Sequence, residues 1–230
     1  MDNKITIIII IGLILVGSFL IYSILNFFNI KLKFDTKFVA RTGVFAAISV
    51  ILYTVPFLKF KVPFFPSFLE IHLDEVPALI AGFAYGPISG SLVIIVKTII
   101  KLPMTTTAGV GELADLVFSL AYIIPAALIY KMHRNIKGAV VALVISSLIQ
   151  AAVASMVTAF AMLEFYVFMM PKLTMEGILE LCQKINPNIH DLGWGFVLYF
   201  GLPFNLFKDA IVVAITFVLY KHTHRLIDKI

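Results

Sequence analysis

Four polar residues stand inside otherwise apolar segments of the sequence: Lys97, Glu164, Asn205 and Lys208. Such groups are costly in apolar surroundings, so each indicates a function or a pairing. Asn205 and Lys208 are three residues apart and therefore share one face of a helix. An amide that donates and accepts hydrogen bonds, next to an ammonium group, suits a polar heterocycle with carbonyl and imide groups. The pair is predicted to bind such a ligand.

Both lysines also have a structural interpretation. Lys208 would pair with Glu164 or Asp209 and only hold helices together. Lys97 lies deep in its segment, one turn before Lys101, which can snorkel to an interface. We expect Lys97 to pair with a carboxylate or to reach the cavity, and the pairing is the preferred interpretation.

A stretch of Thr and Gly, Thr105–Gly111, precedes Glu112 at the expected start of a helix. Hydroxyls and unpaired N–H groups at a helix N-terminus bind polar or anionic groups, although Thr also caps helices for structural reasons. The pattern G-x-x-x-x-G-K-[ST] is absent, which excludes ATP hydrolysis through that motif. His222 and His224 are two residues apart and do not share a helix face, so we predict no metal site.

Two further segments each have two interpretations. The connection Phe57–Leu73 is rich in Phe and Pro; its rings would stack on a flat ligand as a lid, or form an interfacial aromatic belt. The small residues Ala40, Gly43, Ala46 and Ala47 form one surface of the predicted helix Phe38–Pro56, which precedes this connection, and Gly43 and Ala47 have small-xxx-small spacing. Such a surface allows another helix to approach closely, either a partner's or one of this chain.

The composition determines the class of protein that must position these residues. The chain has 230 residues, 61% hydrophobic and 13% charged, with a mean hydropathy of +1.03. A water-soluble domain needs more charge on its surface, so a globular protein of the aqueous phase is excluded. The single cysteine, Cys182, excludes an internal disulfide.

Charges and Pro/Gly breaks divide the chain into seven predicted membrane helices. The first, within Ile5–Ile30, is too long for a signal-peptide core and is predicted to be a retained leading helix. The remaining six form a core, and a short surface helix is expected around Met175–Lys184. The predicted core helices are Phe38–Pro56, Asp74–Tyr85, Ile88–Leu102, Glu112–Tyr130, Gly138–Met170 and Gly195–Tyr220. We therefore divide the all-α membrane protein into residues 1–34, the extra helix and a basic linker, and 35–230, the six-helix substrate-binding domain.

The distribution of Lys and Arg predicts the orientation. Successive connections between the predicted helices must lie on alternate sides of the membrane. This places ten Lys and Arg residues on one side and six on the other, while Lys97 and Lys208 lie inside helices. The more basic side should be cytoplasmic. The protein is thus expected to lie in the cell membrane with its N-terminus outside, its C-terminus in the cytoplasm and its three long connections facing outward as a cup.

Several of these segments, taken in order, resemble the riboflavin-specific substrate-binding (S) components of energy-coupling factor (ECF) transporters. The similarity covers about Phe38 to Tyr220. The resemblance implies a six-helix fold with an outward-facing pocket for riboflavin, which is the transported ligand and not a cofactor. It also implies partners: a transmembrane coupling subunit and two ATPase subunits, so that this chain is not itself an enzyme. The segments are Phe68–Ile80, Tyr85–Gly90, Lys97, Thr105–Asp115, Pro125–Tyr130 and Pro203–Lys208.

The resemblance also implies roles for individual residues. Asn205 and Lys208 match the flavin-contacting Asn and Lys of the last helix. The surface of Ala40, Gly43 and Ala47 matches the one that docks on the coupling subunit. The pocket rim is matched by Thr106, Thr107, Gly111 and Glu112. The gating loop is matched by the Phe57–Leu73 connection, which includes Phe68 and Leu69.

This chain departs from the family pattern at three positions. Glu164 stands where an Asn is usual, His72 where an acidic residue is common, and Asp115 where an Asn is usual. A carboxylate at 164 accepts from a flavin imide N–H or a ribityl hydroxyl, so we expect Glu164 in the substrate site. Alternatives are an S component for another flavin or vitamin, a proton-coupled secondary transporter using Glu164, and a membrane enzyme. The sequence shows no set of metal ligands or nucleophile and base that an enzyme would need.

Overall fold

A computed structural model describes residues 35–170 and 172–227 of the chain. Two π-helical turns, Thr158–Met162 and Val197–Gly201, each join one α-helix directly to the next. The elements are α2 (Thr36–Thr54), β1 (Phe60–Lys61), β2 (Glu70–Ile71), α3 (Glu75–Tyr85), α4 (Pro87–Lys101), α5 (Val110–Met132), α6 (Ile136–Val157), α7 (Leu163–Met169), α8 (Met175–Gln183), α9 (Trp194–Phe196) and α10 (Leu202–Ile227).

Five helical segments among the described residues are long and apolar enough to cross a membrane, and α3 is a shorter apolar helix. Together they confirm the predicted all-α core of six helices. The surface helix expected around Met175–Lys184 is present as α8. The predicted leading helix lies outside the described residues. The five segments are Thr36–Thr54, Pro87–Met104, Val110–Met132, Ile136–Met169 and Trp194–Thr223.

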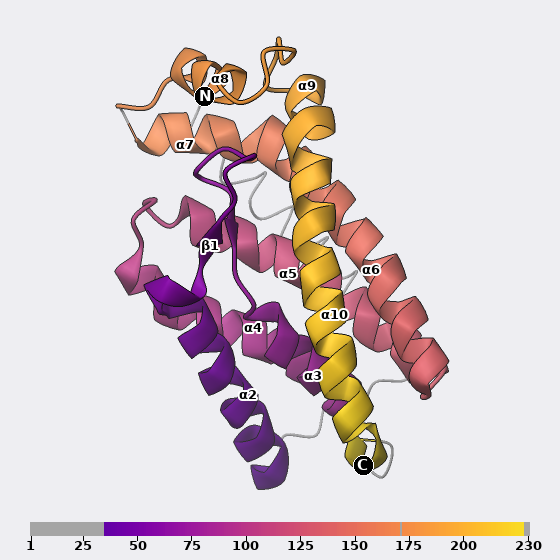
Figure 1. Ribbon diagram of the computed structural model, residues 1–230. Coiled ribbons are helices and arrows are strands. Elements are labelled where there is room, and N and C mark those ends of the chain that lie inside the picture. The colour runs from indigo at the N-terminus through magenta and orange to yellow at the C-terminus, as the bar shows by residue number, and fades with distance from the viewer. Residues whose placement is uncertain (1–34, 171, 228–230) are drawn as a thin grey trace, which may run out of the picture. The chain divides into compact units, whose positions relative to one another are not determined.

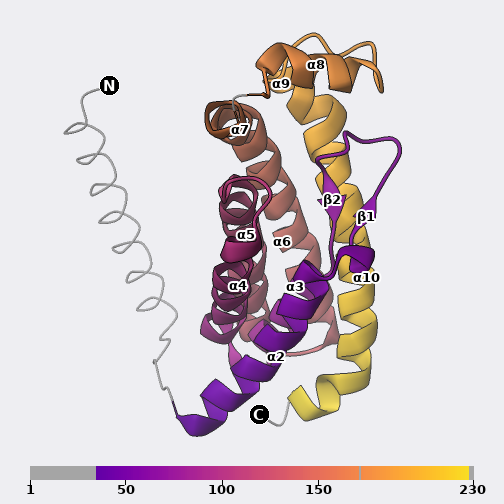
Figure 2. The same cartoon turned by 90° about the vertical axis from the view of Figure 1, so that its left-hand side faces the viewer.

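The helices of this part of the chain lie side by side, and α10 runs along most of the bundle (Figure 1). The short α8 and α9 lie at the same end as α7 (Figure 2). The connection between α2 and α3 contains the antiparallel pair β1–β2, in which Phe60 pairs with Ile71. This hairpin extends toward the end that carries α7 and α8, as both views show.

Two glycines allow α3, α4 and α5 to pack closely. A Cβ added at Gly90 of α4 would lie 2.6 Å from Ile123 Cγ2 and 2.8 Å from the carbonyl oxygen of Ala78. It would also lie 3.1 Å from the Cα of Gly82, the small residue of α3 at this crossing. Small residues let helix backbones approach in a membrane, where van der Waals packing drives association.

A Gly90→Ala substitution is therefore expected to destabilise the protein by about 1–3 kcal/mol, the usual cost of overpacking. The matched control is Gly43→Ala on α2, where an added Cβ meets no heavy atom of the described residues within 4 Å. Thermal unfolding of both variants in detergent checks this prediction. Equal melting temperatures for the two variants would show that the α3–α4 crossing can relax.

The described apolar interior consists of two clusters. One includes Phe83, Ile123 and Val212, and extends over α3, α4, α5, α6 and α10. The other includes Leu163 and Phe200, and joins α7, α8 and the start of the last transmembrane segment. Buried polar residues lie between these two clusters along the last transmembrane segment, and they form part of the candidate site.

Candidate functional site

The last transmembrane segment shows how the sequence positions the site. Phe200 belongs to one apolar cluster and Val212 to the other, while Asn205, Lys208 and Asp209 lie between them and are all buried. The π-helical turn Val197–Gly201 comes directly before these residues. Such turns shift the side chains that follow and are frequent at functional sites.

Asn205 and Lys208 lie on the same buried part of α10 but contact different residues. The Asn205 amide nitrogen donates to the carbonyl oxygen of Gly201 at 2.9 Å, and its oxygen accepts from Gln150 of α6 at 3.4 Å. The ammonium of Lys208 donates to Oε1 of Glu75 at 2.9 Å. The predicted structural pairing of Lys208 with Glu164 or Asp209 is therefore wrong in its partner: the carboxylate comes from the first residue of α3.

Lys97 confirms the expected pairing with carboxylates. Its side chain is fully buried, and its ammonium contacts the carboxylates of Asp74 and Asp115, the latter at 2.6 Å. The ring of Tyr53 lies 4.4 Å from the same ammonium, so α2 contributes a cation–π contact. Two carboxylates around one buried cation compensate its charge at the place where α2, α3, α4 and α5 meet.

His72 completes this cluster. Its Nδ1 contacts Asp74, and its Nε2 lies 3.4 Å from Asp115. Burial lowers the pKa of His72 to about 4, against the opposing negative charge of Asp115. The ligand atoms of these three residues are close enough together to surround an ion, but the Lys97 ammonium already contacts both carboxylates. The absence of a metal site therefore stays a prediction.

Ser119 of α5 connects the two lysine clusters. Its hydroxyl lies 3.5 Å from the Lys97 ammonium and donates to Glu75 Oε1 at 3.3 Å. The two cations are thus joined through Ser119 and Glu75 into one buried polar network. Within this network a change at Lys208 alters the electrostatic surroundings of Lys97 as well.

The Thr/Gly loop surrounds the first turn of α5. The hydroxyls of Thr105 and Thr107 both donate to Oε2 of Glu112, at 2.7 and 3.1 Å. The backbone N–H of Gly111 donates to the Thr107 hydroxyl at 3.1 Å. Glu112 is buried, whereas Thr106 is exposed. The loop is therefore a compact hydrogen-bonded rim in which the side chain of Thr106 is exposed.

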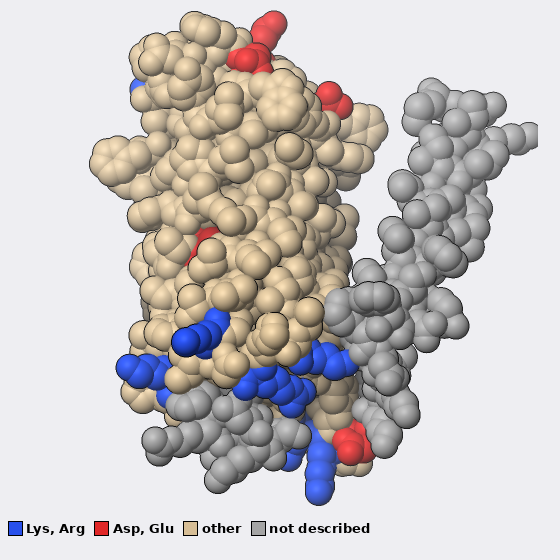
Figure 3. Space-filling view, turned by 90° about the vertical axis from the view of Figure 1, so that its right-hand side faces the viewer, with Lys and Arg blue, Asp and Glu red and all other residues tan. Residues whose placement is uncertain are grey.

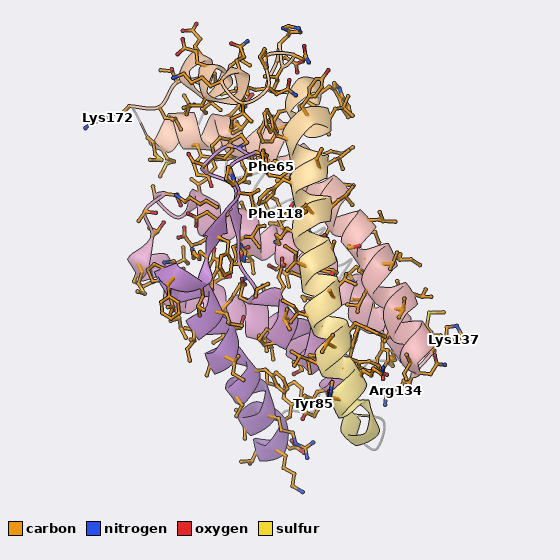
Figure 4. All side chains as sticks on the ribbon, viewed as in Figure 1. Phe65, Tyr85, Phe118, Arg134, Lys137 and Lys172 are labelled. Carbon is orange, nitrogen blue, oxygen red and sulfur yellow. The ribbon has the colours of Figure 1, made fainter. Side chains whose placement is uncertain are left out.

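The Phe57–Leu73 connection packs against the last transmembrane segment. The Phe65 ring meets the Phe204 ring edge-on at 5.3 Å, and Phe68 stacks on Phe196 at 6.2 Å. Leu69 packs with the apolar cluster at the same end. Figure 4 shows Phe65 where this connection passes α10. Aromatic contacts thus place the connection next to Asn205, one residue from Phe204.

A hollow of about 460 Å³ borders this connection, with Phe64, Lys184 and Tyr199 in its lining. Neither Asn205 nor Lys208 lines it. The hollow is therefore separate from the buried pair.

The remaining predicted residues lie elsewhere. Glu164 is exposed on α7 and makes no ion pair within the described residues, so its place in a substrate site stays a prediction. Ala40, Gly43 and Ala47 are all exposed on α2, but the prediction was wrong for Ala46, which is buried and packs in the apolar interior. Their small-residue surface is therefore not used for packing within the described part of the chain.

The site also contains residues that sequence interpretation missed. Glu75, Ser119 and Gln150 are fully buried and contact the predicted residues directly. A Glu at the start of a helix is an ordinary first-turn residue in sequence, which hid the role of Glu75. The only available signal was its position as a second acidic residue, after Asp74, directly before an apolar helix.

Three comparisons with known proteins give consistent results. A family model described as "ECF transporter, substrate-specific component" matches residues 37–220. "Riboflavin transporter RibU" of Staphylococcus aureus is 25% identical over 203 residues, which are 88% of this chain and 100% of that protein. "Riboflavin transporter FmnP" of Bacillus subtilis is 28% identical over 185 residues, covering 79% and 90%. A solved structure described as "Structure and mechanism of the S component of a bacterial ECF transporter" has a TM-score of 0.65 at 23% identity, covering 83% of this chain and 96% of that chain.

Proposed function

Since the chain belongs to the family of substrate-specific components of ECF transporters, we propose that it captures riboflavin and delivers it for uptake across the cell membrane. This is a transporter family, and the protein is a multi-pass membrane protein. The observation that carries the ligand assignment is the buried pair Asn205 and Lys208 between two apolar clusters, in a chain similar to two riboflavin transporters.

The chemistry of the site fits a flavin. Lys208 uses one ammonium N–H for Glu75 and keeps two for carbonyl groups of a ligand. Asn205 supplies an amide beside it. The ring system of a flavin is flat and apolar at its benzenoid end, which suits Phe65, Phe68 and Leu69 of the adjacent connection. The rim residues Thr106, Thr107, Gly111 and Glu112 would contact the more polar parts of the ligand.

The Phe57–Leu73 connection is the gate in this proposal. Aromatic contacts to Phe196 and Phe204 and the packing of Leu69 hold it to the rest of the described chain, whereas the ion pairs of Glu70 lie within the connection itself. These ion pairs would stay intact if the connection moved as a unit, and a hollow borders it beside Phe64. Opening would therefore cost mainly the two ring contacts and the packing of Leu69, and would admit the ligand to the buried pair.

Transport requires partners in this proposal, because ATP is hydrolysed by other subunits. Ala40, Gly43 and Ala47 form an exposed small-residue surface on α2, suited to close contact with a transmembrane coupling subunit. Two ATPase subunits would drive that coupling subunit. The extra helix and linker, residues 1–34, would precede the substrate-binding domain, residues 35–230.

The charges of the described residues support the proposed orientation. Lys and Arg gather toward one end of the visible face, and most visible Asp and Glu lie toward the other (Figure 3). Arg134 and Lys137 lie at the end opposite Lys172 (Figure 4). By the positive-inside rule the end with Arg134 and Lys137 is cytoplasmic, so the gate faces outward and the C-terminus is in the cytoplasm. The N-terminus would then be outside.

Uptake into vesicles distinguishes this function from proton-coupled transport. We expect vesicles that contain this protein and the coupling complex to accumulate radiolabelled riboflavin only with ATP, and a proton gradient without ATP to have no effect. Accumulation driven by the gradient in vesicles that lack ATPase subunits would contradict the proposal. Excess unlabelled thiamine is the control for ligand class and should not compete.

A further inference from the structure

The carboxylate of Glu75 is the centre of the buried polar network. Its oxygen Oε1 accepts hydrogen bonds from Lys208 at 2.9 Å and from Ser119 at 3.3 Å. The side chain is 0% exposed. The second oxygen, Oε2, is buried and has no hydrogen-bond partner among the described residues.

A carboxylate oxygen in this position needs a donor. Buried polar groups are nearly always hydrogen-bonded, and the cost of leaving one unpaired is largest when the group is charged. No described residue donates to this oxygen: the hydroxyl of Tyr122, which is a donor, and both carboxylate oxygens of Asp209 also lack partners within the described chain. Asp209 brings only further acceptors when ionised.

The position of Glu75 relative to Lys208 gives the two residues complementary roles. Lys208 is a donor with free N–H groups, and Glu75 is an acceptor with a free oxygen, and the two are in direct contact. Such a pair fits a ligand edge that presents a carbonyl and an N–H or O–H group close together. An apolar ligand would leave both groups unsatisfied.

We propose that Glu75 is a substrate-binding residue: Oε2 accepts a hydrogen bond from the bound ligand while Oε1 holds the Lys208 ammonium in place. This inference rests on the proposed function. Riboflavin offers donors of the required kind, the imide N–H of its ring system and the hydroxyls of its ribityl chain. Glu75 thereby selects for a donor on the ligand and Lys208 selects for an acceptor.

A Glu75→Gln variant tests the inference with three flavins. Gln keeps the volume and one oxygen for Lys208, but its amide nitrogen cannot accept a hydrogen bond. The probes are riboflavin, 3-methylriboflavin, which lacks the imide N–H, and lumiflavin, which lacks the ribityl hydroxyls. Dissociation constants come from quenching of flavin fluorescence. We expect riboflavin binding to weaken about 10- to 100-fold, the scale for losing a hydrogen bond to a charged group.

The analogues separate a direct contact from a structural effect. For the probe that lacks the donor, the loss caused by Glu75→Gln should fall below about 3-fold, because that hydrogen bond is already absent. The matched control is Ser119→Ala, which removes a donor to Oε1 and leaves Oε2 unchanged; it should affect all three probes equally. Glu75→Asp, which keeps the charge and shortens the side chain, gives the same ligand-selective pattern where Glu75→Gln does not fold.

Two results would overturn the inference and leave the proposed function unaffected. One is an equal loss for all three probes, which would mean that Glu75 acts only through the fold or through Lys208. The other is unchanged riboflavin binding in a folded Glu75→Gln protein. Failure of the wild-type protein to bind any of the three flavins would instead contradict the proposed function itself.

Discussion

A Lys208→Ala variant is expected to bind riboflavin about 10- to 100-fold more weakly than the wild-type protein. The ammonium is buried, and the expected loss corresponds to a net contribution of one charged hydrogen bond to the ligand, about 1.5–3 kcal/mol. It also leaves Glu75 as an uncompensated buried carboxylate, so the ligand-free protein should melt at a lower temperature. Fluorescence titration gives the affinity, and thermal unfolding without ligand gives the stability.

The matched control is Lys101→Ala. Lys101 is the last residue of α4 and has no place in the polar network, so the same change of side chain should leave riboflavin binding within about 2-fold. A Lys208→Gln variant keeps a donor and most of the volume, and should fold more readily. A folded Lys208 variant with wild-type affinity would remove Lys208 from the substrate site.

An Ala47→Phe variant is expected to bind riboflavin normally but to lose at least about 90% of ATP-driven uptake. Ala47 is exposed on α2 beside Gly43 and Ala40, and the added ring would stand out from a surface that allows close helix approach. Because the change points away from the described interior, it should not disturb Asn205 or Lys208. Binding is measured in detergent and uptake in vesicles with the coupling complex.

Two controls on the same helix make this prediction specific. Ile48→Phe adds a similar ring at an exposed position outside the small-residue surface, and should support uptake. Ala46→Phe enters the interior, where Ala46 is 3% exposed, and should reduce stability. If Ala47→Phe abolished binding as well, the surface would be part of the fold and not a docking site. Equal uptake by the Ala47 and Ile48 variants would also exclude the docking role.

The local properties of the fold could be predicted from sequence. Each transmembrane helix is marked by its apolar run, and α3 by the apolar residues before the Gly86–Pro87 turn, so the six-helix core followed directly. The pairing of Lys97 was also predictable, since a deeply buried ammonium requires a carboxylate. These conclusions depend on composition and short spacings, which one sequence contains.

The residue that pairs with Lys208 could not be predicted from the sequence. Lys208 and Glu75 are 133 residues apart, and nothing in the sequence indicates that α10 crosses the start of α3. Glu164 is one of the two partners that the sequence predicts for Lys208, but the π-helical turn Thr158–Met162 precedes it and its side chain is exposed. A π-helical turn changes which face a residue occupies, and helical spacing alone does not reveal it.

Purification of the protein in detergent from a flavin-replete host, followed by its visible absorption spectrum, tests the central claim most directly. The proposed function predicts a yellow protein whose flavin absorption is released on denaturation, and a Lys208→Ala protein purified in parallel that has lost most of the colour. A colourless wild-type protein that also fails to quench the fluorescence of added riboflavin would contradict riboflavin capture by this chain.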